Sequence, residues 1–157
     1  MRCSTRCAPA GHGRRTAVDA FDADVLIYAA LPGHALGRRV QALFTTPAVL
    51  AGEAMAGVGS VLLLPELLSK PLRERSAGQL GALATLLGRL ELRPTDLATA
   101  ELAVALAAEH RLRAADAIHL ATAVGVGADR FVTNNSRDFP KSIPEIGITY
   151  AIDLPEP

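Results

Sequence analysis

Five short, mainly apolar segments alternate along this chain with longer segments of helical periodicity, and this order limits the possible folds more than any other feature. The segments expected to form strands are residues 16–21, 57–64, 90–92, 130–133 and 147–151. The second ends in Val61, Leu62, Leu63 and Leu64 without polar alternation, which is typical of a strand buried on both faces of a parallel sheet. Strands separated by helices predict an α/β fold, in which helices flank a mostly parallel sheet of four to five strands.

The segments between these strands carry helix signals. Apolar residues between positions 36 and 44 fall on one face of a helix that should end before Pro47. Pro65 suits the first position of a helix that begins at Glu66, and Pro71 is expected to break or bend that helix. Further helices are expected at residues 77–89, at 97–110 after an N-cap among residues 94–96, and at 114–124.

Length and composition favour one globular domain. The chain has 157 residues, of which half are hydrophobic and a fifth are charged. Sixteen basic residues balance sixteen acidic ones. This balance excludes a protein that coats nucleic acid nonspecifically, but not an enzyme that holds a short RNA through a metal ion and a few arginines. Aromatic residues make up only 4% and Trp is missing, so a base-stacking platform is not expected.

Residues 1–15 contain no apolar segment and are expected to form a flexible extension, so that the domain spans residues 16–157. Both cysteines, Cys3 and Cys7, lie in this extension, which rules out a disulfide framework across the core. No apolar run approaches the ~18 residues that a membrane span requires. We therefore expect a cytoplasmic protein without membrane contact.

Carboxylates follow the ends of several apolar runs. Asp22 and Asp24 come after the first expected strand, Glu66 after the second and Asp138 after the fourth, while Asp116 lies at the start of an apolar helix. Strand ends form the ligand crevice of an α/β fold. Carboxylates gathered there repel one another unless a hard cation such as Mg²⁺ or Mn²⁺ lies among them. The pattern therefore indicates metal-assisted phosphodiester chemistry.

These residues also have structural explanations. Asp22 or Asp24 could cap the next helix, and Glu66 could be a first-turn residue favoured by the helix dipole. Asp116 is harder to explain in this way, because its apolar neighbours would leave an unpaired carboxylate at a large cost in free energy. His119 lies on the same helical face as Asp116. It is interpreted as a hydrogen-bonded core histidine, with a metal ligand or a base as alternatives.

Four segments carry a family resemblance that extends over residues 17–154: DADVLIY at 22–28, PELL at 65–68, ADAIHLATA at 115–123 and VTNNSRDF at 132–139. In order and spacing they resemble the PIN-domain ribonucleases, and among these the VapC-type toxins of bacterial toxin–antitoxin pairs. The resemblance implies an α/β three-layer sandwich around a parallel sheet. It also implies an enzyme that uses Mg²⁺ or Mn²⁺ to cut RNA, and an antitoxin partner that silences it.

The resemblance also assigns roles to the acidic residues. Asp22, Glu66 and Asp116 match the catalytic acids of the family. Asp22 and Asp116 are expected to hold the metal ion, and Glu66 to complete its shell directly or through water. Asp24 stands where Asn or Ser is common, and it is expected to support the site.

The last motif departs from the family pattern. Many members place an acid two residues after Thr133, where this chain has Asn135. Asp138 could substitute for that acid. Thr133 and Asn135 are supporting candidates under this reading, although both could be turn formers only.

The expected partners are an RNA substrate, a cognate antitoxin and a second copy of the chain. A twofold homodimer is expected because helix 97–108 has more apolar surface than one sheet face can cover. Two other readings stay open. The pair Asp22 and Asp24 also resembles the nucleophile and acid–base pair of a haloacid-dehalogenase-like phosphatase, and Asn135 is compatible with a catalytically inactive PIN-like binding module.

Overall fold

The computed structural model describes residues 17–157, so the extension expected at residues 1–15 and the first residue of the expected domain lie outside the described residues. Within that part, five parallel strands form one sheet with the order β3-β2-β1-β4-β5. The strands are β1 (Asp19–Phe21), β2 (Gly57–Ser60), β3 (Leu90–Arg93), β4 (Arg130–Thr133) and β5 (Gly147–Tyr150). The predicted parallel sheet is confirmed.

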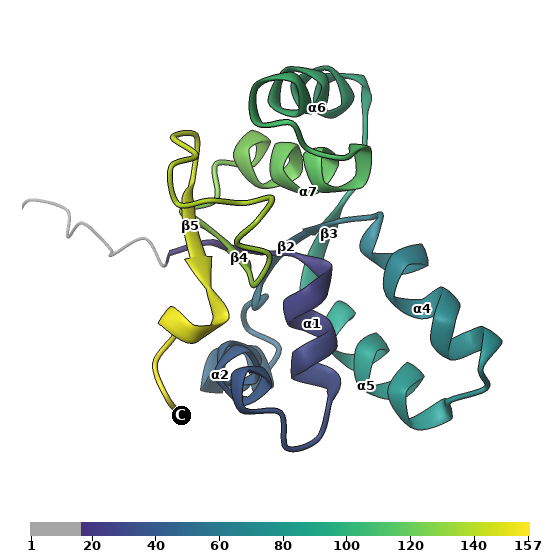
Figure 1. The fold of residues 1–157 in the computed structure, drawn as a ribbon. Helices are drawn as coiled ribbons and strands as arrows, with labels where there is room; N and C mark the ends of the chain where they lie inside the picture. The colour runs from purple at the N-terminus through teal and green to yellow at the C-terminus, as the bar shows by residue number, and fades with distance from the viewer. Residues whose placement is uncertain (1–16) are drawn as a thin grey trace, which may run out of the picture.

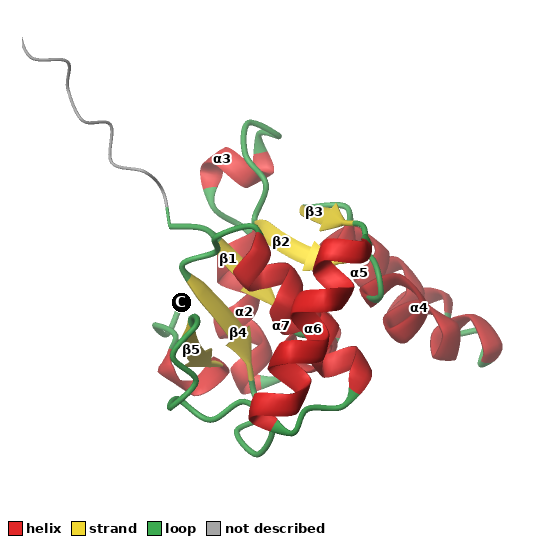
Figure 2. Ribbon diagram, turned by 90° about the horizontal axis from the view of Figure 1, so that it is seen from above, coloured by secondary structure: helices red, strands yellow, loops and turns green. Residues whose placement is uncertain are grey.

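Helices cover both faces of this sheet (Figure 1). One face carries α6 (Leu97–His110) and α7 (Ala114–Gly125), which Figure 2 shows side by side. The other face carries α1 (Ala23–Ala30), α2 (Ala35–Phe44) and α5 (Ala77–Leu87), and α4 (Leu63–Arg73) packs on α5 and projects to the side. A short α3 (Pro47–Leu50) precedes β2, and a 3₁₀ turn (Ala151–Asp153) follows β5. The predicted three-layer sandwich is confirmed.

Alternation along the central strand divides the core in two. Phe21 and Val132 belong to the cluster beneath α1, α2 and α5, whereas Ala20 and Phe131 belong to the cluster beneath α7. Successive side chains of a strand point to opposite faces, so β1 and β4 each contribute to both clusters. The pairing of Phe21 with Val132 also brings the carboxyl ends of β1 and β4 together. The residues that follow these two strand ends therefore meet at one edge of the sheet.

The strand prediction was wrong at residues 61–64. The strand ends at Ser60, and α4 begins at Leu63. Leu63 and Leu67 lie one helical turn apart and both enter the core, so this apolar run is the buried face of a helix rather than a strand. Pro65 falls in the first turn of α4, where a backbone N–H has no helical acceptor.

Pro71 was expected to break or bend its helix, and the expectation of a break was also wrong. The helix α4 continues through Pro71 to Arg73, and the ring of Pro71 is buried. Because Pro71 lies in the last turn, its missing N–H removes one hydrogen bond close to the helix end, and burial of the ring offsets that loss. The helices expected at residues 77–89, 97–110 and 114–124 are confirmed as α5, α6 and α7. None of the helices in residues 17–157 is long and apolar enough to cross a membrane.

Candidate active site

Asp22 lies directly after β1 and is 5% exposed. It is the N-cap of α1, because its Oδ1 accepts a 2.8 Å hydrogen bond from the N–H of Ala23. Its Oδ2 accepts a 2.7 Å bond from the hydroxyl of Thr133, the last residue of β4. The capping role considered from the sequence is therefore confirmed, and it leaves further lone pairs on both oxygens. The two bonds fix the carboxylate at the sheet edge.

Asp24 lies in the first turn of α1, beside Asp22. Its Oδ2 accepts a 2.9 Å hydrogen bond from the N–H of Asn134, while its Oδ1 is buried and has no hydrogen-bond partner among the described residues. Burial, followed by the negative charge of Asp22, raises the pKa of Asp24 to about 7. An unpartnered buried carboxylate oxygen beside a second carboxylate is an environment that a cation would stabilise.

Asp116 comes from the other side of the sheet, in the first turn of α7. Burial raises the pKa of Asp116, and the charges of Asp138 and Glu66 raise it further, against the opposing effects of His119 and Arg113. Burial also raises the pKa of Asp22, to which the charge of Asp116 contributes. These charge effects indicate that acids predicted from separate segments of the chain lie in one region. The pKa values of Asp22, Asp24 and Asp116 are all raised, so the positive charges nearby do not fully offset the burial and repulsion of these carboxylates.

Glu66, on α4, is joined to α7 by His119. Nε2 of His119 lies 2.8 Å from Oε2 of Glu66. The His119 ring is buried, so this bond confirms the predicted hydrogen-bonded core histidine, although its Nδ1 has no hydrogen-bond partner within the described chain. Its partner was not predicted, because Glu66 and His119 are 53 residues apart and no local pattern links them.

The loop after β4 is held by its own side chains. The N–H of Asn135 donates to the hydroxyl of Thr133 at 3.0 Å. The side-chain amide of Asn135 donates to Oδ2 of Asp138 at 2.8 Å, and the N–H of Asp138 donates back to Oδ1 of Asn135 at 3.2 Å. Asn135 is therefore a turn-forming residue in this structure. It also orients Asp138, whose charge acts on Asp116.

The donor chemistry fits a hard divalent cation. Carboxylate oxygens are the ligands that Mg²⁺ and Mn²⁺ prefer. In the described part of the chain, no group of three or more His, Cys, Asp or Glu side chains is arranged to hold a metal ion. Several of the oxygens have protein partners instead: Glu66 is turned to His119 and Asp138 to Asn135. The fit therefore rests on the raised pKa values of Asp22, Asp24 and Asp116 and on the unpartnered Oδ1 of Asp24.

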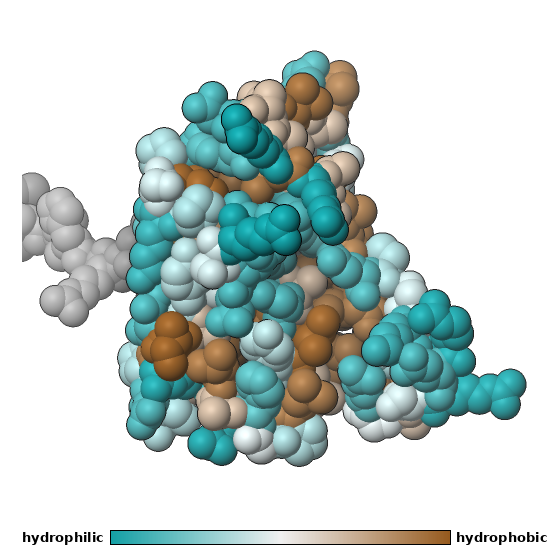
Figure 3. Space-filling model, in the orientation of Figure 1, coloured by the Kyte–Doolittle hydropathy of each residue, from teal (hydrophilic) through white to brown (hydrophobic). Residues whose placement is uncertain are grey.

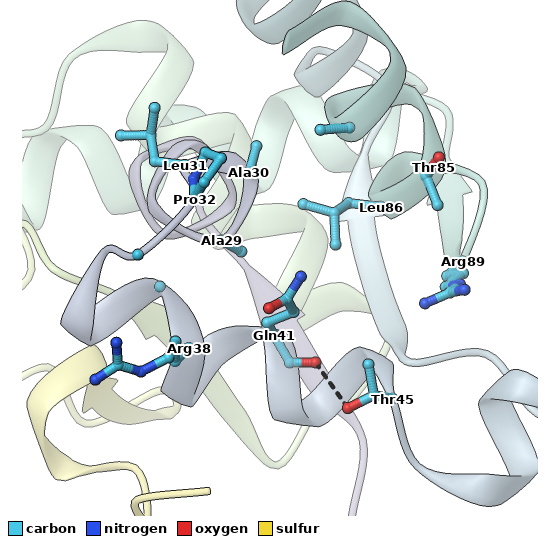
Figure 4. Close-up of a pocket in the computed structure, with 13 residues that line it drawn as sticks. Ala29, Ala30, Leu31, Pro32, Arg38, Gln41, Thr45, Thr85, Leu86 and Arg89 are labelled. Carbon is cyan, nitrogen blue, oxygen red and sulfur yellow. Dashed lines mark hydrogen bonds between the residues drawn. The ribbon is translucent and has the colours of Figure 1, made fainter. Parts of the chain in front are cut away.

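A separate pocket of about 380 Å³ lies between α1, α2 and α5 (Figure 4). Its polar lining comes from Arg38, Gln41, Thr45, Thr85 and Arg89, and the end of α1 supplies apolar residues. None of the site residues predicted from the sequence lines this pocket. It is therefore distinct from the acidic region at the sheet edge.

Comparison with known proteins agrees with this geometry. The sequence profile described as the PIN domain matches residues 20–142. The chain belongs to the PIN-domain family. The predicted family is thus confirmed, and the matched residues of this PIN domain include Asp22, Glu66, Asp116 and Asp138. Among curated proteins, none matches the chain.

Solved structures share the fold of this PIN domain. A toxin–antitoxin complex from Klebsiella pneumoniae matches with a TM-score of 0.65 and 24% identity, covering 87% of this chain and 99% of that chain. VapBC2 from Rickettsia felis, bound to a DNA fragment from its promoter, matches with a TM-score of 0.65 and 19% identity over 85% and 98% of the chains. DNA-bound VapBC from Salmonella typhimurium matches with a TM-score of 0.61 and 24% identity over 87% and 99%. At these identities the similarity establishes the fold.

Proposed function

We propose that this PIN domain is a Mg²⁺- or Mn²⁺-dependent endoribonuclease that hydrolyses RNA phosphodiester bonds. The observation that carries the proposal is that Asp22 and Asp116, from opposite faces of the sheet, come close enough for the charge of Asp116 to raise the pKa of Asp22, while burial raises the pKa of both. Without a cation such a cluster lowers the stability of the fold, and shifted pKa values of this kind are typical of functional sites. Asp22 and Asp116 would hold the ion, with Glu66 beside them and Asp24 and Asp138 in support.

A divalent ion bound there would lower the pKa of a water molecule and offset negative charge on the phosphate. The protein supplies the remaining functions. Thr133 and the N–H of Ala23 keep the Asp22 carboxylate in one orientation. Glu66 is half exposed, so its carboxylate can meet the attacking water, orient it and accept its proton. Arg113, whose charge acts on Asp116, would hold the RNA backbone close to the acids.

We further propose that the enzyme is the toxin of a toxin–antitoxin pair and acts in the cytoplasm. Three solved structures with this fold are toxin–antitoxin or VapBC complexes, two of them with DNA. We also expect the homodimer. Leu97 and Val104, both on α6, are 75% and 71% exposed, and Figure 3 shows apolar surface over this helix at the top of the view. A second copy of the chain would cover it.

The test is cleavage of a labelled single-stranded RNA by the purified protein with Mg²⁺, with Mn²⁺ and with a chelator. Cleavage should need the metal and should be abolished in Asp116→Asn, which removes one carboxylate from the cluster. The matched control is Asp96→Asn, because Asp96 is an exposed acid that caps α6 and Asn caps equally well. Undiminished cleavage by Asp116→Asn at equal metal concentration contradicts the site.

The same preparation separates the two other readings. A haloacid-dehalogenase-like phosphatase would hydrolyse p-nitrophenyl phosphate through an aspartyl-phosphate, whereas a ribonuclease would do neither. The PIN-domain match disfavours that reading. An inactive binding module remains the alternative that Asn135 keeps open. Titration with Mn²⁺ in a calorimeter distinguishes it, because an inactive site should show no binding that depends on Asp22.

A further inference from the structure

His119 joins two helices that carry different acids of the site. It lies on α7, three residues after Asp116, and its Nε2 is 2.8 Å from Oε2 of Glu66 on α4. The two partners differ sharply in exposure: the side chain of His119 is 1% exposed and that of Glu66 is 42% exposed. A side chain fixed in the core therefore restrains one that would otherwise move at the surface.

The position of the imidazole proton follows from the surroundings of the ring. Nδ1 of His119 is buried and has no hydrogen-bond partner in the part of the chain that the structure describes. A proton on Nδ1 would leave a buried donor unsatisfied and would turn the lone pair of Nε2 toward the carboxylate. No buried donor is left without a partner when Nε2 carries the proton, because the Nε2–H then donates a hydrogen bond to Oε2 of Glu66. His119 is then a directed donor, aimed at one carboxylate.

A cationic side chain is also available to Glu66 on its own helix. Lys70 follows it by four residues on the exposed side of α4, which is the favoured spacing and direction for a Glu–Lys ion pair on a helix. Among the side-chain contacts of residues 17–157, however, Glu66 is bonded to His119 and forms no ion pair with Lys70. The contact with His119 therefore turns the carboxylate away from the outer surface and toward α7, where Asp116 lies.

We propose that His119 is a positioning residue, whose Nε2–H holds the Glu66 carboxylate on the side of Asp116 and keeps it from pairing with Lys70. This inference rests on the proposed nuclease function. His119 touches neither the metal ion nor the RNA in this role. It acts through Glu66. Substitution of His119 should therefore cause part of the decrease in activity that substitution of Glu66 causes, although all acids of the site are kept.

Three substitutions at one position test the proposal. In His119→Gln the amide nitrogen can reach the place of Nε2, in His119→Asn it reaches only the place of Nδ1, and His119→Leu has no donor. We expect Gln to keep kcat within about threefold of wild type, and Asn and Leu to lower it about tenfold or more with KM for RNA little changed. Thermal unfolding of each variant reports whether the fold is kept. If Gln is as impaired as Leu while all variants fold, the donor is unimportant and the proposal is overturned.

A double-mutant cycle identifies the route of the effect. In a Glu66→Ala background, His119→Leu should lower the residual cleavage rate no further, because the group through which His119 acts is already missing. A full additional tenfold loss would show that His119 acts independently of Glu66, which contradicts the proposal.

Calorimetric titration with Mn²⁺ provides a readout that does not depend on catalysis. The apparent affinity should be weakened about tenfold in His119→Leu and Glu66→Ala and should be preserved in His119→Gln. Equal Mn²⁺ affinity in wild type and His119→Leu would overturn the positioning role. If the wild type bound Mn²⁺ with this pattern but cut no RNA, the proposed function would fail while the role of His119 in holding Glu66 would stand.

Discussion

The hydroxyl of Thr133 donates a 2.7 Å hydrogen bond to Oδ2 of Asp22, although 111 residues separate the two in sequence. The same hydroxyl accepts a 3.0 Å bond from the N–H of Asn135, so one buried side chain ties Asp22 to the loop that carries Asp138. Strand pairing between β1 and β4 makes this contact possible. The orientation of the first acid of the site thus depends on the end of the fourth strand.

Thr133→Val should test this bond, because Val keeps the shape of Thr and removes the hydroxyl. The change leaves a buried carboxylate oxygen and the N–H of Asn135 without their partner, so we expect a loss of about 1–3 kcal/mol in the free energy of unfolding. Cleavage should fall as well. Thr133→Ser, which retains the hydroxyl and loses only a buried methyl group worth about 0.8 kcal/mol, is the control and should lose less stability than Thr133→Val in urea denaturation. Equal stability of Thr133→Val and wild type would contradict a stabilising role for the bond.

The raised pKa of Asp24 predicts a pH dependence of stability in metal-free protein. Its pKa is about 7 in the folded protein against an ordinary value of 3.8. Between pH 3.8 and pH 7, Asp24 is therefore protonated in the folded protein and ionised in the unfolded chain. Stability should therefore be greater near the lower end of this range and should fall as the pH rises through 7. In Asp24→Asn this contribution disappears. Urea denaturation with a chelator at several pH values measures it, and identical pH profiles for the two proteins would contradict the assignment.

Binding of a divalent cation should offset the repulsion among the carboxylates of the site and so stabilise the fold. Mn²⁺ at about 100 times its Kd should stabilise the folded protein by about 2.7 kcal/mol, because it binds only the folded site. In Asp22→Asn the increase in Tm should be lost. The carbonyl oxygen of Asn can still cap α1, and its amide nitrogen can donate to the hydroxyl of Thr133, so the variant is expected to remain folded. Asp96→Asn, which alters the exposed cap of α6, should keep the full Mn²⁺ effect. An undiminished shift in Asp22→Asn would exclude Asp22 as a ligand.

A prediction about the scaffold concerns the contact between α1 and α2. A Cβ atom at Gly37 would lie 2.0 Å from the backbone oxygen of Tyr28, so only glycine permits this close approach. We expect Gly37→Ala to lower the free energy of unfolding by about 1–3 kcal/mol or more. Gly78→Ala, in α5, is the matched control, because nothing lies within 4 Å of a Cβ there. That change should stabilise the protein by about 0.5–1 kcal/mol, since alanine favours the helix.

The order of strands and helices could be predicted from sequence because most of it follows from local periodicity. The error at residues 61–64 has a clear cause. Four consecutive apolar residues suit a buried strand and a buried helix start equally well, and only the packing of Leu63 and Leu67 in the core decides between them. The continuation of α4 through Pro71 likewise depends on burial of the proline ring, which the sequence does not reveal.

The candidate site divides in a similar way. Asp22, Asp24, Glu66 and Asp116 could be selected because each stands at a segment end or in an apolar context. The hydrogen bonds that these acids accept could not be predicted from the sequence. The bond from His119 to Glu66 and the bond from Thr133 to Asp22 span 53 and 111 residues, and they depend on how helices and strands are placed in space. Local sequence is enough to select candidate acids, whereas tertiary packing decides which hydrogen-bond donor each of them contacts.

The position of β1 in the middle of the sheet has a consequence for the time at which the site can form. β1 is among the first elements of the described chain to be synthesised, yet one of its two neighbours, β4, is among the last. A growing chain that has not reached β4 leaves one edge of β1 open and Asp22 without the hydroxyl of Thr133. Asp22 can therefore be held in its final orientation only near the end of translation, and the proposed ribonuclease has no complete site while its chain is still short of β4 on the ribosome.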